Sequence, residues 1–393
     1  MTQASPVRKR RVFYLPGYDP MPARHYREIY RREGAAQAEI SGYGLQVQAV
    51  AADGRYAWQV AAEMDGAKTR TDIEFLTWND IVVASMQAGI PASYWLLLRT
   101  LWLYLRSGTL FALVRLRPAP MIAAFYPVLL LLGQLGLGLL ALWLAVLALG
   151  WWGWPIGIAA LTAILVVFKR LDKKIYAYYL LYVYAFSAWH TEGYPPALRL
   201  RLEGFKRRIA QALAEGNDEV LVVGHSVGAH LGVELLAEME REGMITGDTP
   251  LALLTLGHVV PMISYLPKAR RLRRNLHALG KSRRIYWVDV TAPGDGGCFA
   301  LCDPVAVSGV GAGPKILSAA FSKTLSPERF ARQKRAFFKQ HFQYLHAFDR
   351  PGIYDYFAIT AGPLTLEGRF GAQPSSPSRR SRCYSKYTDI ADV

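Results

Sequence analysis

The sequence predicts an α/β protein, with a mostly parallel sheet flanked by helices and an inserted hairpin of two transmembrane helices. Two observations support this prediction. Short apolar strands alternate with amphipathic helices on both sides of the chain's middle third, a pattern typical of parallel sheets with crossover helices. Residues 118–168, a run of 51, contain no Asp, Glu, Lys, Arg or His, whereas about 20 apolar residues suffice for one membrane span.

Residues 1–90 are expected to form the first part of the α/β domain. Residues 11–15 are a short apolar strand that enters a turn-rich Pro-Gly segment, and residues 23–32 read as a helix. Further strands are expected at 44–50 and 71–76, with a strand or hairpin arm at 56–64 between them.

Residues 91–190 are expected to be the membrane insertion, with spans at about 121–148 and 151–168. The turn between the spans is expected at 150–155, where three tryptophans suit a membrane interface. Basic residues flank both outer ends and none lies in the turn. By the positive-inside rule, the catalytic domain and both termini then face the cytoplasm, as in a bacterial-type inner membrane. Residues 91–117 resemble an interfacial amphipathic helix, and the tyrosine-rich residues 175–189 a similar collar.

Residues 191–371 are expected to complete the α/β domain, and the Ser-, Pro- and Arg-rich residues 372–393 to form a disordered tail. The expected order is a helix at 196–215, strands at 220–223 and 251–256 around a helix at 230–241, and a strand at 285–290. Residues 268–284 carry eight Lys or Arg and no acid, within a net charge of +16. This segment lacks the interleaved aromatic residues of a nucleic-acid groove, so no nucleic acid is expected. A solvated helix and a patch for anionic headgroups both remain open.

The most informative motif is Gly224-His-Ser226-Val-Gly228, which follows an apolar β-branched run and precedes an amphipathic helix. This order is the one a nucleophile elbow requires, because small residues on either side of Ser226 let strand and helix approach each other closely. The backbone N–H of Val227, at the helix N-terminus, is expected to point toward a developing oxyanion.

A serine nucleophile needs a base and an orienting acid, which follow the elbow in the order acid and then His. Asp295, in a Pro-Gly turn after the 285–290 strand, is the preferred acid; Asp303 and Asp289 are the alternatives. His341 is the preferred base and His346 the alternative, since these two histidines follow the acid. We expect His341 Nε2 within hydrogen-bond reach of Ser226 Oγ, with Asp295 at the other ring nitrogen.

The second oxyanion donor is expected to be the N–H of Tyr18, in the Pro-Gly loop after the first strand. An ordinary type II turn is the alternative for this loop. The three cysteines have neither the spacing of a disulfide framework nor that of a metal site. We therefore expect no metal site at these cysteines.

With the elbow, the Pro-Gly loop and the downstream Asp295 and His341, the chain resembles the α/β-hydrolase superfamily of serine esterases and lipases over residues 10–50 and 196–350. The resemblance implies an acyl-serine intermediate that water hydrolyses, with neither a metal nor an organic cofactor. The membrane hairpin between oxyanion loop and elbow departs from the soluble members. The expected function is a membrane-anchored hydrolase for lipid or other apolar acyl esters. Acyl transfer, thioester hydrolysis and a non-catalytic membrane scaffold are the alternatives.

Overall fold

The computed structural model describes residues 6–52, 55–333 and 336–391, and the chain divides into two compact units. Residues 1–82 and 191–393 make the first unit and residues 83–190 the second. Along the chain, α2 (Asn79–Ser85) leads from one unit into the other.

The first unit is built on an eight-stranded sheet of order β2-β3-β4-β1-β5-β6-β7-β8. Strands β4, β1, β5, β6, β7 and β8 pair in parallel, while β3 pairs antiparallel with β2 and β4. The strands are β1 (Lys9–Leu15), β2 (Gly44–Ala52), β3 (Arg55–Met64), β4 (Ala67–Phe75), β5 (Glu219–His225), β6 (Leu251–Leu256), β7 (Ile285–Thr291) and β8 (Lys315–Ser318). Every residue of β5 and β6 is buried, as expected for central parallel strands covered on both faces. The expectation of a mostly parallel α/β sheet flanked by helices is confirmed.

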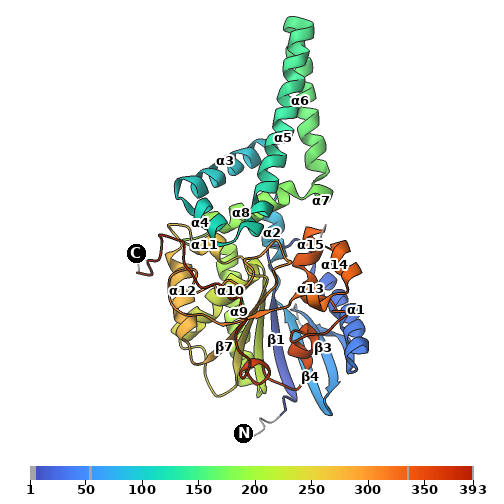
Figure 1. The fold of residues 1–393 in the computed structure, drawn as a ribbon, viewed down its shortest axis with the longest axis vertical. Coiled ribbons are helices and arrows are strands. Elements are labelled where there is room, and N and C mark those ends of the chain that lie inside the picture. The colour runs from blue at the N-terminus through green and yellow to red at the C-terminus, as the bar shows by residue number, and fades with distance from the viewer. Residues whose placement is uncertain (1–5, 53–54, 334–335, 392–393) are drawn as a thin grey trace. The chain divides into compact units, whose positions relative to one another are not determined.

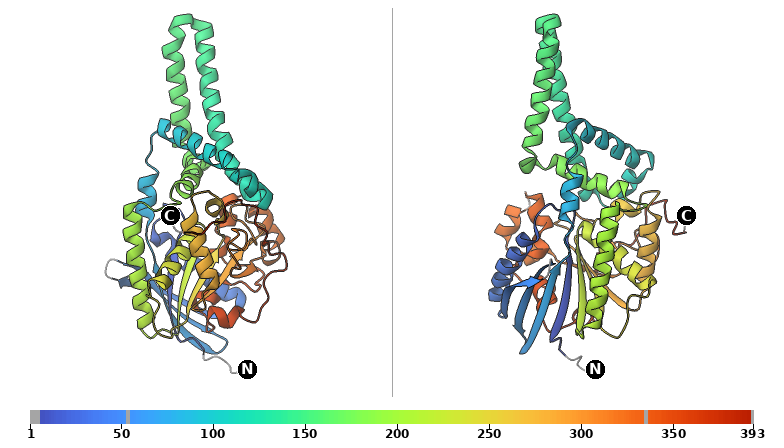
Figure 2. Two further views of the ribbon diagram at one scale, coloured as in Figure 1. Left: turned by 90° about the vertical axis from the view of Figure 1, so that its left-hand side faces the viewer. Right: turned by 180° about the vertical axis from the view of Figure 1, so that it is seen from behind.

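Helices cover both faces of this sheet (Figures 1 and 2). One face carries α9 (Pro196–Ala214), α10 (Val227–Arg241) and α12 (Arg270–Lys281). The other carries α1 (Ala23–Ser41) and two short late helices, α16 (Tyr356–Ala361) and α17 (Leu366–Phe370). The remaining elements of this unit are α11 (Pro261–Ser264), α13 (Phe321–Thr324), α14 (Pro327–Gln333), α15 (Phe337–His341) and the 3-10 turn η2 (Gln343–Leu345). One large hydrophobic core lies between the sheet and the α1 side.

One expectation for the first unit needs correction. The tail is not disordered over its described residues: Arg380 N donates to Leu301 O at 2.7 Å, and Ser376 N donates to Ile316 O at 2.7 Å. The polar tail cannot form a hydrophobic core of its own, but its backbone groups pair with β8 and with the loop that follows β7. The basic run is only partly solvated, because buried Arg273 donates to the carbonyls of Ser264 and Leu266.

The second unit is helical: α3 (Ile90–Arg106), α4 (Thr109–Leu116), α5 (Pro118–Leu149), the 3-10 turn η1 (Gly150–Trp152), α6 (Gly153–Arg170), α7 (Asp172–Ile175) and α8 (Ala177–Trp189). Helices α5 and α6 lie side by side (Figure 2). A Cβ on Gly153 would come within 2.2 Å of Ala145 O, so glycine is required for this close packing. The turn between α5 and α6 is shorter than the expected 150–155. Pro155 belongs to the first turn of α6, where the backbone N–H of a residue has no acceptor within the helix and is not needed.

Within the described residues, one helical stretch, Pro118–Arg170, is long and apolar enough to cross a membrane by itself. Helices α2 and α3, which are bent by 99° relative to each other, meet the same criterion only if they are counted as one span. Of the 18-residue apolar window in Pro118–Arg170, 17% is buried inside the protein. A core helix of a soluble protein is mostly buried, so this stretch exposes apolar surface that a soluble core would cover. The segment expected as one interfacial helix is two helices, since Gly108 adopts a left-handed φ of 74° between α3 and α4.

Candidate active site

The turn between β5 and α10 has the strained geometry that the sequence motif predicts. Ser226 lies between strand and helix with φ 57° and ψ −118°, a conformation that non-glycine residues rarely adopt. A Cβ on Gly224 would lie 2.5 Å from Gly228 O, and one on Gly228 would lie 2.2 Å from Leu15 O. Both glycines are therefore needed for β1, β5 and α10 to meet at this turn. Ser226 is partly exposed, unlike its buried neighbours on β5.

The loop after β1 packs directly against this serine. A Cβ on Gly17 would lie 3.0 Å from Ser226 Cβ and 3.5 Å from Ser226 Oγ. Trp78 Nε1 donates to Pro16 O at 3.1 Å, which anchors the loop. Tyr18 follows in the chain and its ring lies edge-on to Trp78, with centroids 6.1 Å apart.

Val227 is the first residue of α10, so its N–H has no acceptor within the helix. The two predicted oxyanion residues thus lie in the two backbone segments that adjoin Ser226. Backbone N–H groups at a helix N-terminus are well suited to bind negative charge.

The structure pairs the preferred acid with the preferred base. His341, at the end of α15, places Nδ1 2.9 Å from Oδ2 of Asp295, in the turn after β7. The Asp295 side chain is fully buried and that of His341 is 11% exposed. With Nδ1–H donated to the carboxylate, the Nε2 lone pair of His341 is left free to accept a proton.

This pair lies next to the Ser226 turn. Ser226 N donates to Leu256 O at 2.9 Å, and a Cβ on the following residue, Gly257, would lie 3.4 Å from His341 Cε1. The rings of His225 and His341 have centroids 5.0 Å apart. The expected hydrogen bond is not formed, since no described partner accepts from or donates to Ser226 Oγ within hydrogen-bond distance. Catalytic hydrogen bonds of this kind are often long without substrate.

Asp295 is held by more groups than the sequence predicted. Gly297 N donates to Oδ1 at 2.8 Å, and the Tyr344 hydroxyl donates to Oδ2 at 3.0 Å. Burial alone raises the pKa of Asp295, but the charge and hydrogen bond of His341, together with the Gly297 N–H, outweigh it and lower the pKa below its usual value. The carboxylate therefore stays ionised beside the imidazole.

Tyr344 is a site residue that the sequence analysis missed. Its hydroxyl also accepts from Ala292 N at 3.0 Å, so it bridges the end of β7 to the carboxylate. In the sequence, only its position three residues after His341 could have indicated that Tyr344 lies in the site. Nothing in that spacing distinguishes a structural tyrosine from one that touches the acid.

The alternative acids and base have other contacts. Asp303 accepts from the N–H groups of Val305 and Ala306, each at 3.0 Å, which is a turn-capping role. Asp289 accepts from the Thr255 hydroxyl at 2.6 Å within the sheet. His346 places Nδ1 2.8 Å from Phe342 O, and burial lowers its pKa.

His225, next to the serine, is a buried neutral residue. Burial, with a smaller contribution from the nearby His341, lowers its pKa to about 3. Its Nε2 lies 3.0 Å from His341 O, so a ring N–H there fixes the backbone of the base.

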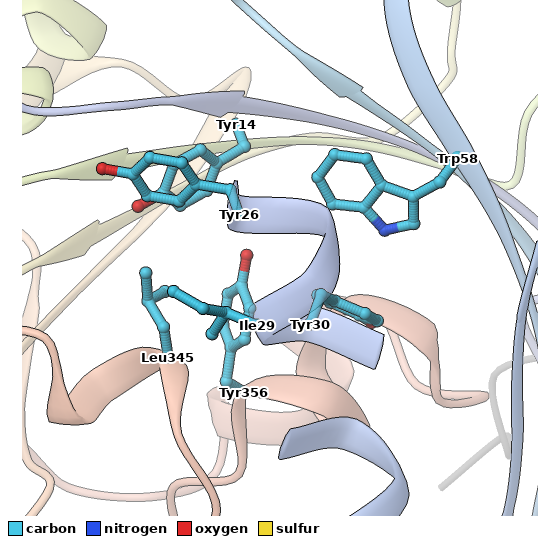
Figure 3. A pocket seen from close by; sticks show the side chains of 7 residues that line it. All are labelled: Tyr14, Tyr26, Ile29, Tyr30, Trp58, Leu345 and Tyr356. Carbon is cyan, nitrogen blue, oxygen red and sulfur yellow. The ribbon is translucent and has the colours of Figure 1, made fainter. Parts of the chain in front are cut away.

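A small pocket lies close to the site on the α1 side of the sheet (Figure 3). Its lining is largely aromatic and consists of Tyr14, Tyr26, Ile29, Tyr30, Trp58, Leu345 and Tyr356. Among the described residues, Tyr14 Oη and Trp58 Nε1 are buried without a hydrogen-bond partner. The Phe342 ring lies between pocket and site, 6.4 Å from the Tyr26 ring and 5.2 Å from the His225 ring. The cavity, of about 10 Å³, has room for about one water molecule and not for a substrate.

In the part of the chain that the structure describes, no group of three or more His, Cys, Asp or Glu side chains could hold a metal ion. All three cysteines are free thiols. Comparison with protein-family models, curated proteins and solved structures found no match for this chain. The chemistry of the site is therefore argued from this chain's own geometry.

Proposed function

We propose that the chain is a membrane-anchored serine hydrolase of the α/β-hydrolase type that cleaves carboxylic esters of lipids or other apolar acyl groups. The observation that carries the proposal is the buried Asp295–His341 pair beside a serine held in a strained strand-to-helix turn. A serine hydroxyl is a weak nucleophile at neutral pH, and an oriented imidazole is what activates it.

The proposed reaction has two halves. Ser226 Oγ attacks the ester carbonyl carbon while His341 Nε2 takes the hydroxyl proton, and the N–H groups of Tyr18 and Val227 bind the resulting oxyanion. Collapse breaks the bond to the alcohol, which leaves with the proton from His341. Water then attacks the acyl-serine, gives its proton to His341, and releases the carboxylic acid as Ser226 regains its hydroxyl.

The ionised Asp295 holds the His341 tautomer and stabilises the imidazolium formed in each half. No step needs a metal or an organic cofactor.

We further propose that α5 and α6 cross the bilayer as a two-span hairpin, with the catalytic unit and both termini in the cytoplasm. The exposed apolar surface of this stretch supports the insertion. The turn carries Trp151 and Trp152, which are 82% and 75% exposed and uncharged, while Lys169 and Arg170 lie in the last turn of α6. This distribution supports an orientation with the turn outside and the basic ends inside, as in a bacterial inner membrane. A substrate drawn from the bilayer follows from this location.

The test is labelling of purified protein with a fluorophosphonate probe, together with hydrolysis of short-chain nitrophenyl esters. Ser226→Ala should abolish labelling and lower kcat by a factor on the order of 10³ or more, as removal of a triad member does. Ser318→Ala is the matched control, because Ser318 ends another parallel strand of the same sheet and is also partly exposed. Labelling of Ser226→Ala equal to that of the control would refute Ser226 as the nucleophile, and no labelling of the wild type or of either variant would favour a non-catalytic scaffold.

A further inference from the structure

Helix α3 carries an apolar stripe that nothing in its own unit covers. Trp95, Leu98, Trp102 and Leu105 are 67%, 54%, 62% and 39% exposed, and their spacing of three and four residues puts them on one helix face. The stripe continues on α4 (Thr109–Leu116), where Phe111 is 68% and Val114 is 39% exposed. Contiguous apolar surface of this kind marks an interaction site.

The opposite face of α3 packs on α8. Ser93 and Tyr182 share a hydrogen bond of 2.8 Å between their hydroxyls, and Trp189 Nε1 donates to the Thr100 hydroxyl at 3.1 Å. Helix α8 lies on the side of α3 away from the tip of the α5–α6 pair (Figures 1 and 2). The exposed stripe therefore faces the side on which the tip of this pair lies.

The start of α3 is fixed at a defined height along this pair. Between α5 and α6, Gly138 packs on Leu161 and Gly157 packs on Leu142. The same antiparallel register, continued along the two helices, places Lys169 of α6 beside residue 130 of α5. The Tyr94 hydroxyl donates to Leu131 O at 2.9 Å, at that same height. Residue 130 lies 20 residues before the turn at Gly150, and about 20 helical residues cross the hydrocarbon layer. Helix α3 thus begins where hydrocarbon gives way to headgroups.

The charge of this unit is one-sided. Residues 83–190 contain eight Lys or Arg and a single acid, Asp172. Exposed Arg106 ends α3, and the Arg99 guanidinium lies 3.6 Å from the centre of the Trp189 ring. Basic residues at the edge of an apolar, tryptophan-bearing face match an anionic lipid surface.

We propose that α3 and α4 form a lipid-binding platform, whose stripe of Trp95, Leu98, Trp102, Leu105, Phe111 and Val114 embeds in one leaflet rich in anionic phospholipid. The platform rests on the proposed insertion of α5 and α6 and is independent of ester hydrolysis. It adds a lateral contact with one leaflet to an anchor that spans both.

Site-directed fluorescence tests the platform. An environment-sensitive probe is attached to a single accessible cysteine introduced into the full-length protein. Cys383 is replaced by serine, and the native Cys298 and Cys302 are kept because both are fully buried. The protein is reconstituted in phosphatidylcholine vesicles with or without phosphatidylglycerol, and quenching is measured with lipids that carry the doxyl group at a shallow or at a deep acyl position. Leu98→Cys samples the stripe and Leu140→Cys, 49% exposed on α5, samples the hairpin. Leu200→Cys, 71% exposed on α9 of the other unit, is the matched control.

The probe at position 98 should be quenched at least about twofold more than the probe at position 200, and more strongly with phosphatidylglycerol present. Quenching at 140 with none at 98 would overturn the platform and leave the hairpin standing. Quenching at neither position would overturn both the platform and the proposed insertion. A probe at 98 that is shielded from water but not quenched by lipid would show a protein partner instead, and would also refute the proposal.

Discussion

Replacement of Tyr344 by phenylalanine separates the site's hydrogen bonding from its packing. The substitution removes one oxygen and keeps a fully buried ring, whose centroid lies 5.0 Å from that of Phe321. The lost hydroxyl donates to Asp295 Oδ2 and accepts from Ala292 N, both at 3.0 Å. Two buried groups on the same side of the site are therefore affected together.

The magnitude follows from these two contacts. An orphaned buried N–H at Ala292 costs about 1–3 kcal/mol, and a lost donor to a carboxylate costs a similar amount. The carboxylate keeps its bonds to His341 and Gly297, so the free energy of unfolding should fall by about 2–4 kcal/mol rather than by the full sum. Without the Tyr344 hydroxyl, Asp295 orients the His341 imidazole less firmly. A loss of about 1.4 kcal/mol of transition-state stabilisation lowers kcat about tenfold and leaves KM unchanged.

Thermal unfolding in detergent and steady-state ester hydrolysis measure the two effects. Tyr354→Phe is the matched control, because the Tyr354 hydroxyl is also buried but donates to the backbone carbonyl of Tyr344 at 2.9 Å. This control should lose comparable stability and keep its kcat. An equal loss of kcat in both variants, or an unchanged kcat in Tyr344→Phe, would refute the positioning role of the Tyr344 hydroxyl.

Three further predictions follow from buried or exposed positions. Burial raises the pKa of Asp289 to about 6, so the stability that Asp289 contributes is full below the unfolded pKa of about 3.9 and is lost as pH rises through 6. Asp289→Asn should therefore stabilise the protein by about 1–3 kcal/mol at pH 8 and by much less at pH 4, as measured by thermal unfolding at both pH values. Gly228→Ala should destabilise the protein by more than about 3 kcal/mol or prevent folding, because the added Cβ would lie 2.2 Å from Leu15 O. Gly232→Ala is the control and should unfold near the wild-type temperature, because its added Cβ would lie 3.3 Å from a single flexible side chain. A cysteine in place of Trp151 should react with an impermeant maleimide added to intact cells, and protection of that cysteine would reverse the proposed topology.

The sequence by itself determined the features that depend on neighbouring residues. The elbow needs only a strand, a serine between two small residues, and a helix, all within about 20 positions, so Gly224, Ser226 and Gly228 could be recognised directly. The apolar stretch before Lys169 was equally plain, because hydropathy is a local property. The alternation of strands and helices also predicted the parallel sheet.

Only the tertiary structure decided the features that join distant segments. Asp295 and His341 lie 46 residues apart, and chain order alone left three carboxylates and two imidazoles as candidates. Which acid pairs with which histidine depends on how the α15 segment packs against the end of β7, and no local sequence pattern encodes that packing. Tyr344 and the paired tail were hidden for the same reason, since composition does not state which buried group a hydroxyl or a backbone amide will meet. Helical spacing put the α3 stripe on one face, but the packing of the opposite face on α8 determined which way it points.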